Sequence, residues 1–507
     1  MQHSWNTTSS HFLFLALCTA IATFPLFLPD YLPGVDIPQH AGQINLLLHM
    51  YNPDFPFRQL FTVHWLTPYL FGYSLVLCIM PVVGLALAFK IVAGLALWSI
   101  PMATAYMLRN LKQDIRLALL CIPCLYGFPF QWGFFNFYVA VPIALFFLGY
   151  IYSLQERLTP RQGVVIVLGV NILFFCHALI WALCGVLAYA AYWTLHASWR
   201  QRLVFASLLL SSLPLCLYWF STDVIQQHMV DHGAFFALSW QRLNILDLVI
   251  GDTQKFYNLA IGFFVLLAPL LLNYRLSAAP ARWLPLLCII LILLFVPHSF
   301  LRIAFLYQRF SIFFIPFYLV ALEKRNISPS SPQRLTTPLV LASSGAIFLL
   351  FLINTTNAML GFNAEIRGFN RILQVMEPER RVLMLEYANR SQFSTAPLFL
   401  HFPLWYQALR GGVVDFNAAS AYTPIVQFQQ LDNPADIPGF EWNPWLFNYV
   451  TFQGTMYSYF IVRSPVDLSR VIFGSHLYKV QLVRHIHAWW LYRNLADPSD
   501  KNISHLM

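Results

Sequence analysis

The sequence is poor in charged residues. Only 10% of its 507 residues are Asp, Glu, Lys or Arg, whereas 58% are hydrophobic. Soluble domains carry about 25% charged residues, so this composition excludes a soluble globular enzyme and a disordered chain. All eight cysteines lie in apolar segments, and none follows Cys288, which argues against a disulfide-stapled secreted domain. The apolar residues gather in runs long enough to cross a bilayer, which takes about 20 residues. We therefore predict a polytopic membrane protein.

The motifs of soluble nucleotide and hydrolase chemistry are also missing. There is no Gly-rich phosphate loop followed by Lys-Ser/Thr, no HExxH, no GxSxG and no Cys/His set with zinc spacing. Thirty Lys and Arg against 21 Asp and Glu give a net charge of +9, but these cations stand in short clusters between apolar runs. The positive-inside rule accounts for that pattern, so we expect no nucleic-acid partner.

Eleven apolar runs are predicted to be spanning helices, because a chain inside the bilayer must satisfy its own backbone groups. They cover residues 11–29, 84–108, 117–131, 134–152, 163–176, 177–196, 203–220, 257–273, 283–300, 303–322 and 337–354. The apolar segment 63–83 could be a further span or a helix that lies in the membrane interface.

The basic clusters favour the second alternative for 63–83. If that segment does not cross and the N-terminus is cytoplasmic, the loops 30–62 and 221–256 face outward, and the basic clusters all fall inside. These clusters are Arg109/Lys112/Arg116, Arg157/Arg161, Arg200/Arg202, Arg275/Arg282 and Lys324/Arg325/Arg334. The predicted fold is therefore a mainly α membrane helix bundle of about 11 spans.

The composition changes near residue 355, where charged residues, Asn, Pro and strand-like runs begin. We predict a transmembrane helical domain over 1–354, which includes the first outer loop 30–62. Residues 355–507 are predicted to form a small α/β domain on the outer face. Its expected strands are 381–386, 412–416, 457–462 and 478–483.

Asp36 is the candidate catalytic acid of the first outer loop. It stands just before Pro38, which predicts extended backbone there, and an amphipathic helix is expected over 39–51. A carboxylate beside the bilayer, in a loop pinned by prolines, is well placed for general-base work on a hydroxyl. Alternatively, Asp36 caps the helix that follows.

Two pairs of short spans meet at polar residues. Gln131, Trp132 and Asn136 stand at one turn, where they could bind a polar substrate, with Trp132 stacked on a sugar ring, or simply knit the turn together. His177 stands at the other turn. An ionisable residue at membrane depth is a functional candidate, although a buried histidine bonded to a backbone carbonyl is the alternative.

Arg302 and Arg309 are spaced by seven residues, which predicts that both point from one face of a helix. Arginine holds phosphate through bidentate, charge-assisted bonds. The pair would suit a lipid-linked phosphate or pyrophosphate. Snorkelling of the side chains to lipid headgroups is the alternative.

The arrangement resembles the GT-C superfamily of integral-membrane glycosyltransferases, which includes protein O-mannosyltransferases and the aminoarabinose transferases that act on lipid A. A single span precedes an outer loop that bears an acid, in the run Pro-Gly-Val-Asp36-Ile-Pro-Gln-His40. The other resembling parts, in particular those of a bacterial branch of the superfamily, are Gln131-Trp-Gly-Phe-Phe-Asn136-Phe, His177, His401…Tyr406…Arg410-Gly411-Gly412 and Val483-Arg484…Trp489-Trp490-Leu-Tyr492.

The resemblance implies an inverting transferase that takes a sugar from a polyprenyl-phosphate-linked donor and passes it to a glycan, lipid or protein acceptor. Asp36 then matches the loop acid that activates the acceptor, and Arg302 or Arg309 could hold the donor phosphate. Many members have paired acids, whereas Asp36 has no adjacent acidic partner, so His40 is the candidate substitute. The remaining candidate substrate-binding residues are Gln131, Trp132, Asn136, His177 and His401.

The resemblance also implies a bacterial inner (plasma) membrane location, with the N-terminus cytoplasmic and the C-terminal domain periplasmic. No resident cofactor is expected with certainty, although a divalent cation, Mg or Mn, could bind a loop acid together with substrate phosphate. Two other functions stay open at this stage. The chain could be a non-catalytic membrane component of envelope polysaccharide assembly, or a transporter or flippase.

Overall fold

The computed structural model describes residues 2–194, 198–225, 234–236, 240–301, 303–325, 336–420, 424–429 and 440–495. Its internal contacts divide the chain into two units. The helical unit comprises Met1–Leu28 and Leu66–Met359, and the sheet unit comprises Pro29–Trp65 and Leu360–Met507. The first outer loop therefore folds with the C-terminal part, whereas the sequence prediction grouped 30–62 with 1–354.

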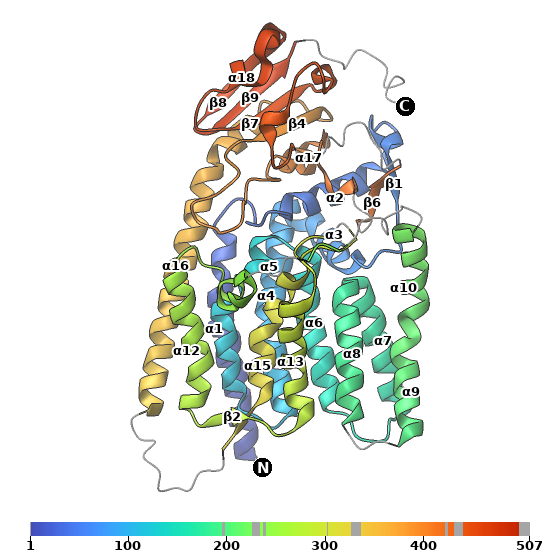
Figure 1. Ribbon diagram of the computed structural model, residues 1–507, viewed down its shortest axis with the longest axis vertical. Coiled ribbons are helices and arrows are strands. Elements are labelled where there is room, and N and C mark those ends of the chain that lie inside the picture. The colour runs from blue at the N-terminus through green and yellow to red at the C-terminus, as the bar shows by residue number, and fades with distance from the viewer. Residues whose placement is uncertain are drawn as a thin grey trace. The chain divides into compact units, whose positions relative to one another are not determined.

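The helical unit contains the apolar helices, which run side by side in Figure 1. The stretches long and apolar enough to cross a bilayer, among the described residues, are Ser9–Phe27, Leu85–Asn110, Phe135–Tyr152, Trp199–Asp223 and Pro338–Leu373. The described helices are α1 (Gln2–Thr23), α3 (Leu70–Val83), α4 (Leu85–Asn110), η3 (Ile115–Cys124), α5 (Phe128–Gln131), α6 (Phe135–Tyr152), α7 (Pro160–Cys176), α8 (Ala178–Trp193), α9 (Trp199–Leu209), α10 (Leu213–Trp219), α11 (Ile245–Ile250), α12 (Lys255–Leu271), α13 (Pro280–Phe295), α14 (Leu306–Arg309), α15 (Phe314–Ala321) and α16 (Thr336–Leu373).

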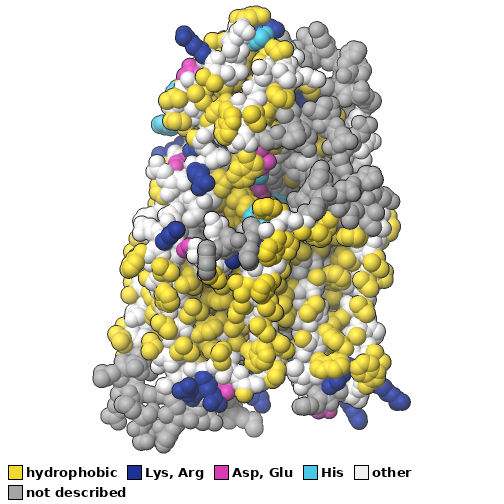
Figure 2. Space-filling model, in the orientation of Figure 1, with side chains coloured by type: hydrophobic (Ala, Val, Ile, Leu, Met, Phe, Trp, Pro, Cys, Tyr) yellow, Lys and Arg dark blue, Asp and Glu magenta, His cyan; other side chains and the backbone are white. Residues whose placement is uncertain are grey.

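The outer surface of the helical unit is apolar. Leu168, Phe263 and Leu349 are each more than half exposed, and hydrophobic side chains cover the helices in Figure 2. Soluble monomers rarely expose contiguous apolar patches beyond a few hundred Å². This surface matches the hydrocarbon of a bilayer, and the chain is a membrane protein.

Hydrogen bonds gather the predicted cytoplasmic loops at one end of the helical unit. Arg282 Nη2 donates to the Leu111 carbonyl at 2.9 Å, and Tyr152 Oη donates to the Ala281 carbonyl at 2.7 Å. These bonds join the loops that follow α4 and α6 to the start of α13. The short strands β2 (Tyr274–Leu276) and β3 (Leu322–Lys324) pair with each other, and Arg275 and Glu323 form an ion pair there. The loops that carry Lys112, Arg282 and Lys324 thus lie together, and the side of the membrane that they face stays a prediction.

Helix α1 runs antiparallel to α4. Trp98 Nε1 donates to the Ala16 carbonyl at 3.0 Å, and Phe27 packs beside Gly94. Leu28 and Leu85 therefore lie at the same end of the helical unit, so the chain between them makes no net crossing. Helix α3, with 14 residues, is shorter than a span of about 20 residues. This arrangement is compatible with an uncrossed segment 63–83, and the total number of spans stays a prediction.

The sheet unit contains a five-stranded mixed sheet in the order β5-β4-β7-β9-β8. Strand β4 is parallel to β5 and β7, whereas β9 is antiparallel to β7 and β8. The strands are β4 (Arg381–Glu386), β5 (Val413–Val414), β7 (Tyr459–Arg463), β8 (Val480–Ile486) and β9 (Trp489–Asn494). Strand β4 coincides with the run expected at 381–386, and β5, β7 and β8 overlap the other three expected strands.

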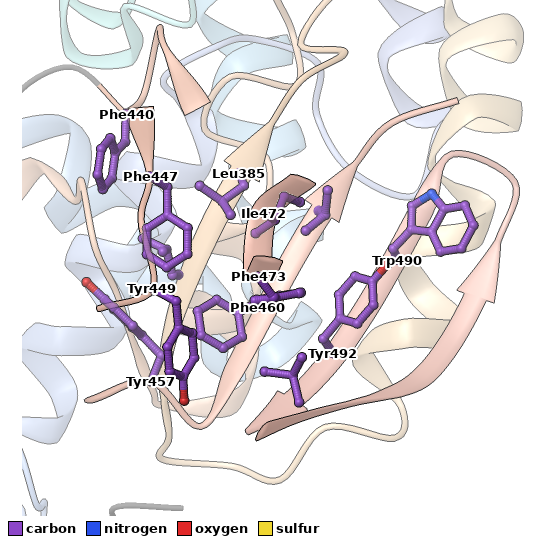
Figure 3. Close-up of a cluster of buried hydrophobic side chains, with 13 residues drawn as sticks. Leu385, Phe440, Phe447, Tyr449, Tyr457, Phe460, Ile472, Phe473, Trp490 and Tyr492 are labelled. Carbon is purple, nitrogen blue, oxygen red and sulfur yellow. The ribbon is translucent and has the colours of Figure 1, made fainter. Parts of the chain in front are cut away.

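A core of aromatic and aliphatic side chains lies against the sheet. Phe460 of β7 is fully buried among Tyr449, Tyr457 and Phe473, and Figure 3 shows these rings together with Tyr492 of β9. Phe473 belongs to the short helix α18 (Ser469–Phe473). Large aromatic side chains bury 150–250 Å² each, so this cluster is a main source of stability for the sheet unit.

We predict that Phe460→Ala lowers the free energy of unfolding of the sheet unit by about 3–5 kcal/mol, because it leaves a cavity where a large ring was buried. Urea denaturation of the detergent-solubilised protein, followed by tryptophan fluorescence, measures the change. The control is Val471→Ala, since Val471 is 71% exposed and should change stability by less than about 0.5 kcal/mol. Equal effects of the two substitutions would contradict the role of this core.

Candidate functional site

Asp36 lies at the N-terminus of α2 (Ile37–His49), within the sheet unit. Its backbone is helical, with φ −91° and ψ −2°, so the prediction of extended backbone was wrong. The residue that Pro38 restricts is Ile37, and Pro38 occupies the second helical position, where a missing N–H costs no helical hydrogen bond. The Asp36 side chain makes no capping bond, so the capping alternative was also wrong.

The Asp36 carboxylate instead contacts His401. Asp36 Oδ1 lies 3.0 Å from His401 Nδ1, and His401 Nε2 contacts Glu441 Oε1 on the other side of the ring. His401 is 7% exposed. Both ring nitrogens face carboxylate oxygens, and both can donate only when the ring is an imidazolium.

Charge governs the protonation of His401. Burial by itself lowers the pKa of this histidine. The negative charge of Glu441, and the hydrogen bonds to Asp36 and Glu441, raise it by more, so that the pKa of His401 is about 10. The ring therefore carries a positive charge at neutral pH, held between two carboxylates.

Polar and aromatic contacts hold α2 against the rest of the sheet unit. Gln39 Nε2 donates to the Phe416 carbonyl at 2.7 Å, and Gln39 Oε1 accepts from the Ala418 amide at 2.6 Å. Tyr31, just before the helix, stacks on Trp405 with ring centroids 4.5 Å apart. Trp405 belongs to α17 (Leu404–Arg410), which packs along α2. Asp36 is thus fixed by a helix that is docked over most of its length.

The site adjoins the carboxyl end of a parallel strand. Gln39 binds the segment that directly follows β5, and β5 is parallel to β4. In open α/β sheets, ligands bind at this edge. A buried ion pair holds the same segment. Arg381 Nη2 contacts Asp415 Oδ1 at 3.1 Å, and Tyr457 Oη donates to Asp415 Oδ2.

Glu441 was not among the residues that the sequence indicated. It stands 405 positions after Asp36 and 40 after His401, in a run with no motif spacing. No local pattern in a single sequence links these three positions. His40, the predicted substitute for a second acid, lies one turn along α2, where its amide donates to the Asp36 carbonyl at 3.0 Å. The second carboxylate comes from Glu441.

In the helical unit, Gln131 ties the turn between α5 and α6 to neighbouring backbone. Its Nε2 donates to the carbonyls of Tyr126, at 3.2 Å, and of Gly251. Trp132 packs on Phe305 with ring centroids 4.0 Å apart. Gln131 therefore makes the contacts expected of its structural alternative. Its substrate-binding role and the sugar-stacking role of Trp132 stay predictions.

Asn136 and His177 are buried in the same unit. Asn136, on α6, is 2% exposed, and its side-chain amide has no hydrogen-bond partner among the described residues. His177 is the N-cap of α8, and its Nδ1 accepts from the Leu179 amide at 3.2 Å. The His177 ring packs against Tyr69 and Phe137, and the substrate-binding role of this residue stays a prediction.

Arg309 lies at the end of α14, with its guanidinium 3.7 Å from the centre of the Phe134 ring. It also donates to the Ala304 carbonyl at 3.0 Å. Arg302 lies outside the described residues. The helix expected over 303–322 begins later than predicted, because α14 starts only at Leu306 and Phe305 has a left-handed φ of +58°. The expectation that the two arginines share one helix face stays a prediction.

The geometry around His401 bears on metal binding. Within the described ranges, no group of three or more His, Cys, Asp and Glu side chains could hold a metal ion. Both nitrogens of His401 face carboxylates, so this ring has no lone pair to offer a cation in this arrangement. A divalent ion bound jointly by Asp36 and a substrate phosphate stays a prediction.

Comparisons with solved structures identify the fold. The chain superposes on ArnT from Cupriavidus metallidurans in the apo state with a TM-score of 0.53 and 13% identity, over 97% of this chain and 99% of ArnT. The same protein bound to undecaprenyl phosphate gives a TM-score of 0.53 at 11% identity, with the same coverage.

The mycobacterial arabinofuranosyltransferase AftD gives a TM-score of 0.52 at 14% identity, over 96% of this chain, which spans only 40% of AftD. No protein-family model and no curated protein matches the sequence. The chain therefore shares the fold of ArnT and AftD, two membrane glycosyltransferases, and this is the fold that the resemblance drawn from the sequence implies.

The raised pKa of His401 predicts a pH-dependent stability. The folded protein keeps a proton that the unfolded chain releases near the ordinary histidine pKa of 6.5. The stabilisation is fully present below pH 6.5 and is lost as the pH rises toward about 10, at about 1.4 kcal/mol per pH unit. Urea denaturation at pH 6, 7, 8 and 9 measures this slope. His401→Gln should remove the contribution of one bound proton, about 1.4 kcal/mol per pH unit, from this slope. An unchanged slope would contradict the charged state of His401.

Proposed function

We propose that this protein is a membrane glycosyltransferase that moves a sugar from a polyprenyl-phosphate-linked donor to a glycan, lipid or protein acceptor. The observation that carries the proposal is the first-loop carboxylate of Asp36, which is held by His401 and is still 28% exposed. The shared fold supports it, and one of the two ArnT structures holds undecaprenyl phosphate. The proposal includes a bacterial inner membrane location, with the sheet unit facing the periplasm and the N-terminus in the cytoplasm.

The chemistry follows from the state of Asp36. One carboxylate oxygen is engaged by His401, which leaves Oδ2 to accept a hydrogen bond from an acceptor hydroxyl. As the acceptor oxygen bonds to the anomeric carbon, its proton passes to Asp36. The bond between that carbon and the phosphate oxygen breaks, and the polyprenyl phosphate leaves with the electron pair. A single displacement of this kind inverts the anomeric carbon.

The leaving phosphate gains negative charge, which fixed cations stabilise strongly in a site of low dielectric. Arg309 is the described candidate, since its guanidinium is held over the Phe134 ring by a cation–π contact. Arg302 stays a candidate by sequence. The neighbouring Trp132 would contact the sugar or the first isoprene units, and Asn136 offers an amide that no described group occupies.

The ordered carboxylate favours an enzyme over the two other functions considered. A carboxylate held by an imidazolium in a folded domain suits proton transfer from a hydroxyl, which neither a transporter nor a non-catalytic assembly component requires. Assays with labelled lipid-linked sugars would identify the donor sugar and the acceptor.

We expect Asp36→Asn to lower the transfer rate by about 10²- to 10⁴-fold, because the amide cannot take the acceptor proton. The purified protein in nanodiscs is incubated with a panel of polyprenyl-phosphate sugars, and transfer of radiolabel to an envelope extract is counted. Asp54→Asn is the matched control, because Asp54 is an exposed carboxylate of the same loop. A wild-type rate for Asp36→Asn would contradict the assigned base.

Arg309→Gln is expected to raise the KM for the lipid-linked donor by about tenfold or more, since it removes a charge-assisted bond to phosphate. Arg275→Gln is the control, because Arg275 forms an ion pair with Glu323 where strands β2 and β3 pair with each other. Competition by free polyprenyl phosphate separates a loss of donor binding from a loss of acceptor binding. Equal KM values for the two variants would remove Arg309 from the donor site.

A further inference from the structure

The two carboxylates around His401 are arranged alike. Each uses one oxygen on a ring nitrogen, Asp36 through Oδ1 and Glu441 through Oε1. Each side chain is also partly exposed, 28% for Asp36 and 29% for Glu441. The imidazole between them is buried, with 9% of its side chain exposed. The ring is therefore the buried centre of a group whose two acidic ends reach solvent.

The two ends differ in how they are held. Asp36 is fixed by α2, which docks through Gln39 and through its packing on α17. Glu441 follows Phe440, whose ring is 1% exposed and packs on Phe447 and Phe452 at centroid distances of 5.7 and 4.7 Å. The backbone beside Glu441 is thus anchored in the aromatic core of the sheet unit. Both carboxylates are presented to the ring by rigid structure.

We propose that Glu441 is a positioning residue for the reaction of Asp36, because its carboxylate keeps His401 protonated so that Nδ1–H holds the Asp36 carboxylate in place. This inference rests on the proposed function. A neutral His401 could present a lone pair to Asp36 in one tautomer, which would repel the carboxylate. An imidazolium has no such tautomer, so its bond to Asp36 Oδ1 has a fixed direction, and Oδ2 stays turned to the acceptor.

Asp36 and Glu441 are the two charged groups that act on the protonation of His401 among the described residues. Asp36 comes from the start of α2, which also carries His40, and Glu441 comes from the segment after Phe440. On the side of Phe399, two residues before His401, the Arg463 guanidinium stacks on the Phe399 ring at 3.6 Å. If Glu441 is made neutral, only Asp36 favours the charged ring, and burial opposes it.

The first experiment observes His401 directly in the full-length protein. Histidines labelled at Cε1 and both ring nitrogens are titrated by NMR from pH 5 to pH 10, and the His401→Gln variant identifies the signal. The wild-type ring should remain an imidazolium beyond pH 8. In Glu441→Gln its midpoint should fall by about 1–3 pH units, whereas Glu441→Asp should keep it high. A wild-type midpoint near 6.5, or one unmoved by Glu441→Gln, would overturn the proposal.

The second experiment measures transfer between pH 6 and pH 9. Glu441→Gln should approach the wild-type rate at pH 6, where His401 stays charged. At pH 9 its rate should fall about two- to 100-fold below the wild-type rate, as a midpoint lowered by 1–3 pH units requires. Glu441→Asp should restore the alkaline activity. The control, Glu379→Gln, removes a carboxylate elsewhere in the sheet unit and should follow the wild-type profile. A uniform loss at all pH values would indicate a structural role only.

The experiments distinguish a failure of the positioning role of Glu441 from a failure of the proposed function. If Asp36→Asn is inactive but Glu441→Gln matches the wild type at every pH, the positioning role is wrong and the proposed function stands. If Asp36→Asn transfers sugar normally, the proposed function is wrong, and the NMR titration still decides whether Glu441 controls His401. If Glu441→Gln does not fold, the wild-type midpoint and the Glu441→Asp variant decide the proposal.

Discussion

The site depends on one buried imidazolium held between two carboxylates that lie far apart in the chain. The contact between Asp36 and His401 closes a separation of 365 residues. Closing so long a loop costs entropy, although the cost grows only slowly with length. The docking of α2 offsets much of this entropic cost, because Gln39, Tyr31 and the packing on α17 fix the loop whether or not the ion pairs form. The charge of His401 then selects where the Asp36 carboxylate points.

This organisation explains why the first loop belongs to the sheet unit and not to the helices that flank it. The segment Pro29–Trp65 supplies α2, and also β1 (Phe61–Val63), which pairs with β6 (Val426–Phe428). A loop with so many partners in the sheet unit is a part of that domain in structural terms. This arrangement allows the Asp36 carboxylate to be held by folded protein on both sides, which a free loop could not do.

Sequence reasoning reached the membrane class and the strand at 381–386, because each has a local cause: apolar length in the first case and the continuous apolar run Val-Leu-Met-Leu in the second. Asp36 was singled out as an acid among prolines, and its catalytic role stays a prediction. It missed Glu441 because long-range pairing leaves no local pattern. It misjudged the backbone at Asp36 by applying the restriction of Pro38 to the wrong residue, and it extended a helix through Phe305, whose φ is +58°. His401 was named only because of the resemblance, since the residues around it form no known catalytic or metal-binding motif.

A structure with a non-hydrolysable polyprenyl-phosphonate sugar bound would test the central claim most directly. The measured quantity is the distance and direction from Asp36 Oδ2 to the anomeric carbon. The account requires this oxygen to face the anomeric carbon from the side opposite the phosphonate, with room for one acceptor hydroxyl between them and with Asp36 Oδ1 still bonded to His401. A sugar bound away from Asp36, or an Asp36 carboxylate turned to bulk solvent, would contradict it.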